Sequence, residues 1–390
     1  MLYDMCAFFP SYFTSSSHRL VQITFGGIIQ MKISQAFHKK LRRSARRAAD
    51  LFHGFLRSYY LKPVMALILS ICLLLTAVPF IMGRLHSHIE KPTKDISPSP
   101  SFDTVEPPDT ATVYRTETGM IETVDFEKYV KGVVSCEMPS SFHKEALKAQ
   151  AVAARTYSAA RIISASEGKN PDAHPAAPLC DTTHCQVYKN ENDLKNIKGE
   201  KWMKKDWRKI SSAVDDTAGQ LLYYKGELVR QALFHSSSGG MTENSEDVFA
   251  SAVPYLVSVE SPYEEEATHQ NEKKAFSISQ FTSAIRTSYP SEAFGQITAD
   301  SIRITERSDG NRVRNMRIGS GSLTGRQVRE ALGLSSANFT IDVSGDTITF
   351  TSNGSGHGVG MSQYGADGMA KNGYDYKKIL SHYYSGTELY

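Results

Sequence analysis

The feature that most constrains this chain is a run of 21 uncharged residues at 63–83, PVMALILSICLLLTAVPFIMG. With a rise of about 1.5 Å per residue, a helix of that length reaches across a hydrocarbon layer of about 30 Å. A buried core helix would normally carry a polar stripe, and this run has none. A signal peptide would have a shorter apolar region and small residues at its cleavage site, whereas GRLHSH follows Met82. The run therefore predicts a retained transmembrane helix.

Basic residues gather on the N-terminal side of that run and predict its orientation. Residues 1–62 hold ten Lys or Arg and two Asp, a net charge of +8, whereas the 390-residue chain carries only +3, which leaves −5 for the remainder. By the positive-inside rule, residues 1–62 are a cytoplasmic segment and the chain beyond residue 83 is extracytoplasmic, as in a single-pass protein of the cell membrane. An acidic remainder argues against nucleic acid as a partner. Residues 1–30 show no pattern and are a candidate untranslated extension, with the true start at Met31.

The composition of the outer part divides it into a stalk and a body. Residues 84–112 contain five prolines and few large apolar residues, which is typical of an extended, semi-rigid linker. Residues 113–390 form the body, with helical patterns on both sides of Pro139 and strand-like runs further on, whereas 168–209 reads as loop with short elements. Within the body, two hairpin signals around a helical run mark 270–350 as a smaller α+β insertion. We therefore predict an α+β fold, with an N-terminal transmembrane helix, a Pro-rich stalk and a mixed helix and sheet body.

Glu137 stands where one predicted helix stops and the next begins, in the sequence VVSCEMP. Beside Cys136, Met138 and Pro139 its carboxyl would be partly removed from water. Desolvation raises a carboxyl pKa, which would keep the group protonated as a general acid. Arg155 follows five helical turns later and would project near Glu137 only if the second helix folds back. The alternative interpretation is a helix-capping or solvated glutamate.

Four potential metal ligands lie in HPAAPLCDTTHCQVY, residues 174–188. Cys and His are the usual ligands of zinc, and closed four-ligand sites are structural. His184 and Cys185 are adjacent, however, so they would need a sharp turn to bind one ion together. A Cys180–Cys185 disulfide is equally compatible with the spacing in a compartment outside the membrane. Whether His174 or His184 would join the cysteines stays open.

Two glycine-rich stretches complete the candidate sites. FHSSSGGMTENSEDVF (234–249) places His235 beside three serines, but the G-x-S-x-G signature of many Ser hydrolases is absent and a plain turn is the simpler interpretation. GSGHGVGMSQYGADGMA (354–370) lacks the glycine spacing of nucleotide-binding loops. Its His357, Gln363 and Tyr364 remain as polar groups on a glycine-rich loop that leads into a helix.

Four strings together resemble one known family: YVKGVVSCEMPSSFHKEALKAQAVAARTYS, CDTTHCQVY, HSSSGGMTENSEDVF and GHGVGMSQYGADGMAKNGYDYKKILSHYYSGT. They look like the stage II sporulation protein D family of endospore-forming bacteria, and the resemblance covers residues 113–390. A single N-terminal span with a large outer domain is also similar to that family. Four motifs in order are far more specific than any one of them. The same domain occurs in proteins described as modifiers of an amidase autolysin.

The resemblance implies a peptidoglycan lytic transglycosylase. Such an enzyme cleaves the β-1,4 bond between N-acetylmuramic acid (MurNAc) and N-acetylglucosamine (GlcNAc) and leaves a 1,6-anhydro-MurNAc end. The family's catalytic acid matches Glu137, which would protonate the leaving oxygen and then act as base on the sugar's 6-hydroxyl, so that no second carboxylate is needed. Arg155 would orient the substrate or Glu137. The candidate groove residues are Lys148, His235, Ser237, Gln363 and Tyr364.

The resemblance also implies a metal and partners. Some family members bind zinc through Cys and His, which favours zinc over a disulfide at Cys180 and Cys185. His174 and His184 both qualify as further ligands, and the zinc would be structural rather than catalytic. Family proteins act on the glycan strands of peptidoglycan during engulfment, in a complex with stage II sporulation proteins M and P.

Two other functions remain open. The domain could hold glycan and activate a cell-wall amidase without cleaving a bond itself. A zinc hydrolase is a further possibility, which would need an open coordination position with a bound water. Only the transglycosylase predicts that Glu137→Gln abolishes the anhydro product while glycan binding survives.

Overall fold

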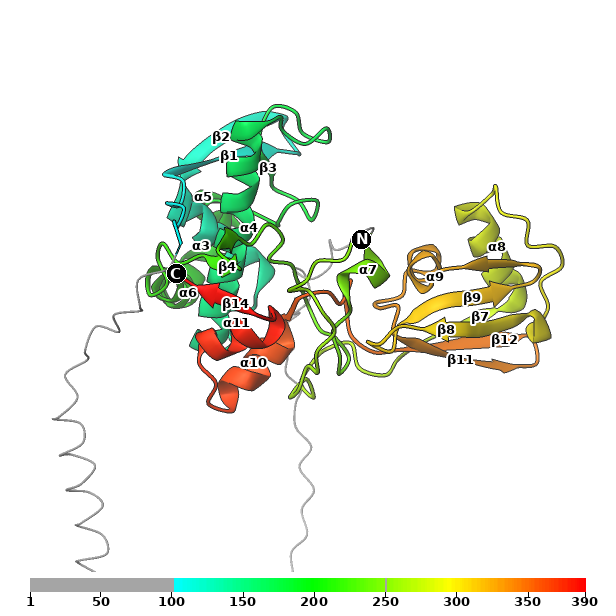
Figure 1. The fold of residues 1–390 in the computed structure, drawn as a ribbon. Helices are drawn as coiled ribbons and strands as arrows, with labels where there is room; N and C mark the ends of the chain where they lie inside the picture. Colours follow the sequence, from blue (N-terminus) through cyan, green and yellow to red (C-terminus); the bar gives the residue numbers. More distant parts are fainter. Residues whose placement is uncertain (1–101, 250) are drawn as a thin grey trace, which may run out of the picture. The chain divides into compact units, whose positions relative to one another are not determined.

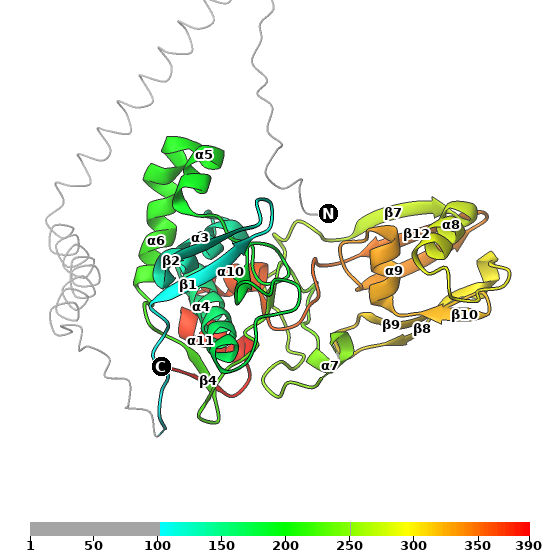
Figure 2. The ribbon, with the colours of Figure 1, turned by 90° about the horizontal axis from the view of Figure 1, so that it is seen from above.

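Figures 1 and 2 show the computed structural model, in which residues 102–249 and 251–390 are described. The predicted cytoplasmic segment (1–62), the transmembrane helix (63–83) and most of the stalk (84–112) lie outside the described residues. Within the described part of the chain, no helix is both long and apolar enough to cross a bilayer. The mixed helix and sheet class predicted for the body is confirmed, with the strands distributed over several small sheets.

The body begins with a β-hairpin and two helices. In chain order, the first elements are β1 (Thr110–Arg115), β2 (Met120–Asp125), α3 (Phe126–Glu137), α4 (Lys144–Glu167) and the short β3 (Leu179–Cys180). β2 and β3 flank β1, the former antiparallel and the latter parallel to it. Asp125 caps α3, because its carboxylate accepts a hydrogen bond from the N–H of Lys128 at 2.9 Å. Met138, whose backbone is extended, ends α3 just before Pro139.

The stretch expected to be loop at 168–209 ends in helices, and the prediction is wrong there. This segment comprises α5 (Glu191–Trp202), a π-helical turn (Met203–Trp207) and α6 (Arg208–Asp215). Only Leu194 of α5 is buried, so the sequence shows no apolar periodicity in this helix. A capping box between Asn190 and Asp193 sets its start instead.

The rest of the body comes from two parts of the chain on either side of the predicted insertion. Its elements are β4 (Leu222–Tyr224), β5 (Glu227–Leu228), β6 (Phe234–His235), α7 (Ser245–Val248), β13 (Met361–Ser362), α10 (Gln363–Lys371), α11 (Tyr376–Tyr383) and β14 (Thr387–Leu389). β14 pairs with β4, and β13 pairs in parallel with β6. The last segment of the chain therefore returns to the body (Figure 1).

The Ala-rich helix α4 is the centre of the body's core. Nearly every residue from Ala146 to Ala160 is buried, and helices α3, α6, α10 and α11 all contact it. Alanine favours the helix and presents so little side chain that neighbouring helices can approach from several sides. The residues around α3, α4 and α10 thus form one hydrophobic cluster.

Residues 272–352 build a second hydrophobic cluster of their own. Figure 2 shows the helices and strands of this stretch. Its elements are β7 (Glu272–Ser277), α8 (Ile278–Ser288), a 3-10 turn (Ala299–Ser301), β8 (Ile302–Arg307), β9 (Val313–Ile318), β10 (Gly321–Leu323), α9 (Gly325–Leu332), β11 (Phe339–Ser344) and β12 (Thr347–Ser352). One sheet has the strand order β10-β9-β8 and the other β11-β12-β7. Both predicted hairpins form, β8–β9 around Asp309-Gly310 and β11–β12 around Gly345.

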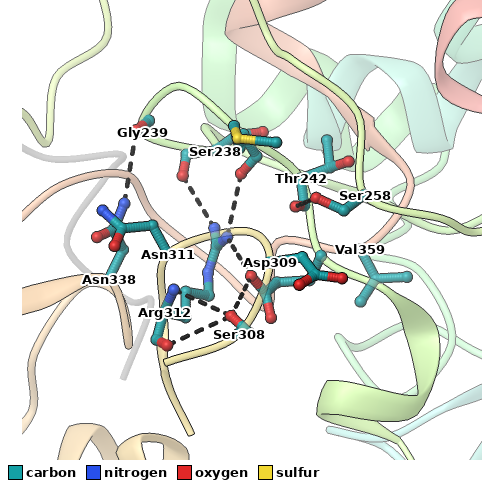
Figure 3. Close-up of polar contacts among 12 residues, drawn as sticks. Ser238, Gly239, Thr242, Ser258, Ser308, Asp309, Asn311, Arg312, Asn338 and Val359 are labelled. Atoms are coloured by element: carbon teal, nitrogen blue, oxygen red, sulfur yellow. Dashed lines mark hydrogen bonds and ion pairs between the residues drawn. The ribbon is translucent and has the colours of Figure 1, made fainter. Parts of the chain in front are cut away.

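Arg312 joins these strands to the body (Figure 3). It ends the turn between β8 and β9, and its Nη atoms donate to the backbone carbonyls of Ser238 and Met241 at 3.0 and 3.2 Å. Its guanidinium also lies 3.5 Å from the buried carboxylate of Glu243. Gly358 rests against the same guanidinium: a Cβ there would stand 2.3 Å from Cζ of Arg312, and φ is +87°. Only glycine fits at this crossing point.

Candidate functional site

Glu137 is the last residue of α3, and its carboxyl lies partly buried at the turn into α4. Its Oε1 accepts a hydrogen bond from the backbone N–H of Val187 at 2.6 Å. Burial raises the pKa of Glu137 to about 7, an increase that the N–H of Val187 partly opposes. Among the described residues, no second carboxylate contributes to this shift. Near pH 7 the group is thus partly present as a neutral acid, the form that can donate a proton.

The neighbouring thiol of Cys136 has a different character. Burial raises the pKa of Cys136 to about 12, and the adjacent Glu137 carboxylate adds to the increase. A thiol that stays protonated at neutral pH is a poor nucleophile. The chemistry that this helix junction offers is therefore that of the carboxyl group.

His174, Cys180, His184 and Cys185 converge on one point, and the ligand atoms that they offer all lie within 4.8 Å of one another. Nε2 of His174 is 3.2 Å from Nδ1 of His184 and 3.3 Å from Sγ of Cys185. The same Nδ1 is 3.8 Å and 3.7 Å from the sulfurs of Cys180 and Cys185. Ligands that surround a tetrahedral zinc at about 2.0–2.3 Å stand about 3.3–3.8 Å apart, so these separations fit a single ion. The cluster could hold a metal.

The two cysteines of this cluster are free thiols, so the Cys180–Cys185 disulfide that the spacing left open does not form. A tight turn, closed by the bond from the N–H of Cys185 to the carbonyl of Thr182 at 3.1 Å, lets the adjacent His184 and Cys185 face the same point. The Cys185 thiol hydrogen-bonds to Cys180 and lowers the pKa of Cys180. A thiolate is the form of cysteine that binds metal.

Both histidines that the sequence analysis named belong to the cluster. His174 is 2% exposed, and its Nδ1 lies 2.8 Å from the carbonyl oxygen of Ala177. A neutral imidazole that donates from Nδ1 keeps a lone pair on Nε2, and Nε2 is the nitrogen that faces His184 and Cys185. His174 is therefore held in the tautomer that a metal ligand requires.

One loop connects this cluster to Glu137. Val187, the hydrogen-bond donor to Glu137, lies two residues after Cys185. Between them, Gln186 is buried and donates to the hydroxyl of Ser158 on α4 at 2.7 Å. The position of the Val187 N–H thus depends on the conformation of the loop that carries two of the potential ligands.

Arg155 does not reach Glu137, and the contact that the sequence suggested is not made. Its side chain is fully buried and forms a bidentate ion pair with Glu127, with Nε–Oε1 and Nη2–Oε2 distances of 2.7 Å. It also donates to the carbonyl of Val214 at 3.2 Å. α3 and α4 form a helical hairpin, so a residue in the middle of α4 lies beside the start of α3. Glu127 is at that start, whereas Glu137 is at the other end of α3.

The other predicted groove residues fall in two places. Gln363 and Tyr364 lie beside the α3–α4 turn, because Gln363 donates to Gln150 of α4 at 3.3 Å and the Tyr364 ring packs edge-on against Phe142 at 4.9 Å. Lys148 does not join them. It pairs with Glu145 at 2.8 Å on the face of α4 that meets α11.

His235 and Ser237 are buried in the segment next to Tyr364, whose N–H donates to the carbonyl of Ser236 at 3.0 Å. Nε2 of His235 lies 2.8 Å from the hydroxyl of Ser238, and burial lowers the pKa of His235, which keeps the ring neutral. The backbone of Ser237 pairs with the backbone of Ser355 in an isolated antiparallel β-bridge. These two side chains support the loop rather than line an open surface.

Two further groups that hold the α3–α4 turn escaped the sequence analysis. Nζ of Lys209 donates to the carbonyl of Phe142 at 2.5 Å, and the carboxylate of Asp367 accepts from the N–H of His143 at 2.6 Å. Both lie far from Glu137 along the chain: Lys209 is in no quoted motif, and Asp367 is in the 354–370 stretch but was not singled out there. Only the packing of α6 and α10 against α4 brings them there.

Comparison with known proteins decides the family. The family model described as Stage II sporulation protein (SpoIID) matches residues 114–224. The stage II sporulation protein D of Bacillus amyloliquefaciens is 37% identical over 345 residues, which cover 84% of this chain and 96% of that protein. This chain belongs to the stage II sporulation protein D family. The stage II sporulation protein D of Bacillus subtilis (strain 168) is 41% identical over 278 residues, or 71% of this chain and 78% of the relative.

A second kind of relative is the amidase enhancer of Bacillus subtilis (strain 168). It is 31% identical over 309 residues, which make up 67% of this chain but 40% of the enhancer. The part matched by the SpoIID model runs from β1 to β4 and includes Glu137 and all four residues of the His/Cys cluster. The family resemblance inferred from the four motifs is thus confirmed, and the chain is a sporulation protein.

Proposed function

We propose that this protein is a membrane-anchored lytic transglycosylase that cleaves MurNAc-β-1,4-GlcNAc bonds of peptidoglycan during engulfment. The observation that carries the proposal is the single carboxyl of Glu137, whose pKa burial raises to about 7 and whose Oε1 a backbone N–H holds in place. Ordinary glycosidases use two carboxylates, and none pairs with Glu137 among the described residues. One carboxyl is enough where the sugar supplies its own nucleophile.

In the proposed reaction Glu137 acts twice. The neutral carboxyl donates its proton to the glycosidic oxygen as the bond to C1 of MurNAc breaks, which leaves an oxocarbenium-like centre and a GlcNAc hydroxyl. The carboxylate then takes the proton of the MurNAc 6-hydroxyl as that oxygen bonds to C1. Glu137 is neutral again, and the product is a 1,6-anhydro-MurNAc end. No water is consumed.

The proposed surroundings of the reaction are the α3–α4 turn and the start of α10. Tyr364 lies next to this turn, is partly exposed and offers a hydroxyl and an aromatic face to the glycan. Gln363 lies beside it but is only 6% exposed, so we retain Tyr364 alone as a candidate glycan contact. Lys148, His235 and Ser237 make contacts away from this turn. Arg155 links α4 to α3 through its ion pair with Glu127.

The proposed cofactor is one structural zinc at His174, Cys180, His184 and Cys185. Two nitrogens and two sulfurs are a donor set typical of zinc, and four protein ligands leave no open position for a catalytic water. This arrangement speaks against the zinc hydrolase. When bound, the ion would tie together the loop that presents the N–H of Val187 to Glu137.

A second candidate function is activation of a cell-wall amidase without glycan cleavage. The relationship to a protein named amidase enhancer favours it. In either function we propose anchoring through residues 63–83, with residues 1–62 in the cytoplasm, and a complex with stage II sporulation proteins M and P. These proposals rest on the charge pattern and on the family resemblance.

The deciding experiment uses the full-length protein in non-ionic detergent with glycan strands stripped of stem peptides. Mass spectrometry of the products should show 1,6-anhydro-MurNAc ends with the wild type and none with Glu137→Gln. Glu117→Gln, on an exposed turn between β1 and β2, is the matched control and should cleave as the wild type does. Strands that are bound but never cleaved would overturn the transglycosylase and favour the amidase activator.

A further inference from the structure

A cavity of about 310 Å³ opens away from Glu137, where the β8–β9 hairpin and α9 meet the segment around α7. Neither Glu137 nor any member of the His/Cys cluster lines it. One wall comes from the body, with Glu243 and Phe249, and the other from the second hydrophobic unit, with Arg312 and Arg329. Figure 3 shows the Arg312 corner of this region.

The charged side chains that line the cavity are four arginines and three carboxylates. Arg312 pairs with Glu243, and Arg326 pairs with Glu330. Arg314 pairs with Asp247 and also with Glu306. The remaining cation is Arg329, which has no carboxylate within ion-pair distance among the described residues.

Arg329 is a partly buried guanidinium with few protein partners. Its Nε donates to the carbonyl of Leu334 at 3.3 Å, and burial lowers the pKa of Arg329 without removing its charge. Glu330 is close enough to raise the pKa of Arg329 but forms its ion pair with Arg326. Arg329 is thus desolvated without an ion pair of its own, and an anionic ligand would supply one. His357, which also lines the cavity, adds no charge, since burial lowers the pKa of His357 to about 4.

Arg312 holds the corner of the cavity and is not itself a ligand group. The residue is 3% exposed, its Nη atoms bind backbone carbonyls of the body, and its guanidinium packs against Gly358. Its Nε has no hydrogen-bond partner among the residues that the structure describes, but that atom is closed off from solvent. The group that a ligand could reach is therefore Arg329.

The body wall is mixed, with apolar groups beside the ion-paired carboxylates of Glu243 and Asp247. The ring of Phe249 is 38% exposed and meets His357 edge-on at a centroid distance of 5.6 Å, with Val248 beside it. A partly exposed aromatic ring can pack against the apolar face of a sugar or against an aliphatic side chain. The cavity therefore combines a site for one negative charge with a surface for a compact apolar group.

We propose that this cavity binds a free carboxylate of peptidoglycan, with Arg329 as the charged partner and Phe249 as the packing surface. The inference rests on the proposed function, because it takes peptidoglycan as the ligand. Two carboxylates of the polymer share this chemistry: the lactyl carboxylate of MurNAc, which is free where the stem peptide has been removed, and the C-terminal carboxylate of a stem peptide. A guanidinium can bind either by two parallel hydrogen bonds.

The test measures binding of small probes to the full-length protein in non-ionic detergent by isothermal titration calorimetry. MurNAc is compared with GlcNAc, which lacks the lactyl group, and a stem tetrapeptide is compared with its C-terminal amide. We expect one acid of the two pairs to bind at least about tenfold more tightly than its neutral counterpart. MurNAc as the preferred acid identifies the lactyl carboxylate, and the tetrapeptide identifies the stem peptide.

Three variants make the test specific. Arg329→Gln should abolish the preference for the acid, and Phe249→Ala, at an exposed position that tolerates truncation, should weaken binding several-fold. Arg303→Gln changes an exposed arginine on β8 outside the cavity and should bind as the wild type does. If neither acid is preferred, or if Arg329→Gln and Phe249→Ala both bind like the wild type, the proposal fails. This test measures binding and not cleavage, so its failure is distinct from a failure of the proposed function. If the protein cleaves strands through Glu137 but prefers neither acid, only this inference fails.

Discussion

The backbone N–H of Val187 lies 2.6 Å from Oε1 of Glu137, and this hydrogen bond joins the candidate acid to the loop of the His/Cys cluster. The bond stabilises the carboxylate, while burial favours the neutral acid, and burial is the larger effect. The structure thus balances Glu137 between its two protonation states near neutral pH. A group that must first donate a proton and then accept one benefits from that balance.

The first prediction concerns the pH dependence of cleavage. Because the neutral form of Glu137 starts the reaction, kcat/KM should be constant below its pKa and fall about tenfold per pH unit above about 7. Rates of anhydro-MurNAc release between pH 5 and 9 provide the measurement. A rate that keeps rising through pH 8 would show that Glu137 is not the acid.

The second prediction concerns stability. The pKa of Glu137 is about 7 in the folded protein and about 4.5 when unfolded, so the wild type should lose stability as the pH rises between these values. Glu137→Gln cannot ionise and should be more stable than the wild type at pH 8 by about 1–3 kcal/mol, with little difference at pH 4.5. Urea unfolding at both pH values measures this. Glu117→Gln should show no such pH-dependent gain.

The third prediction separates structure from chemistry at Arg155. Arg155→Met leaves Glu127 without its bidentate partner and should lower the free energy of unfolding by about 2–4 kcal/mol. The loss should not be larger, because the Glu127 side chain is 29% exposed and water can partly solvate the unpaired carboxylate. At a temperature where the variant is folded, cleavage should stay within about twofold of the wild type. Unfolding and cleavage are measured on the same preparation. A folded variant without activity would return Arg155 to the candidate site.

The fourth prediction concerns the metal. Purified protein should contain about one equivalent of zinc, and Cys185→Ser should lower zinc affinity at least about 100-fold. Cys136→Ser, a change of a thiol outside the cluster, should keep the metal. Chelation should increase amide hydrogen exchange in residues 174–188 and reduce cleavage, because the N–H of Val187 loses its support. Cleavage lost without any change in exchange would indicate a catalytic metal instead.

The fifth prediction tests the crossing of Gly358 and Arg312. An alanine at 358 would press on the guanidinium and adopt an unfavourable φ, whereas Gly345→Ala at φ +58° meets no atom within 4 Å. Gly358→Ala should therefore destabilise the protein by about 2–4 kcal/mol more than Gly345→Ala, which should cost about 1 kcal/mol. Urea unfolding of the two variants gives the comparison. Equal losses would mean that the Arg312 contact adjusts freely.

Local chemistry explains which features could be predicted. Asp125 caps α3 with its own side chain, and Asp309-Gly310 and Gly345 allow hairpin turns through their backbone preferences. α5 was missed because its helix is defined by a capping box and carries a single buried residue, Leu194. A pattern of apolar residues reports burial, and it is silent where a helix lies mostly on the surface.

The sequence by itself determined the family, through four ordered motifs, and it singled out Glu137 and the His/Cys cluster because their residue types carry their chemistry wherever they lie. Only the tertiary structure decided their partners. The α3–α4 hairpin is centred near residue 141, so residues about 14 positions before and after that centre face each other. Arg155 therefore forms its ion pair with Glu127, whereas Glu137 accepts its hydrogen bond from Val187. The unpaired charge of Arg329 likewise emerges only when two separate parts of the chain meet. Pairing between distant residues depends on packing, and packing is set by the whole fold.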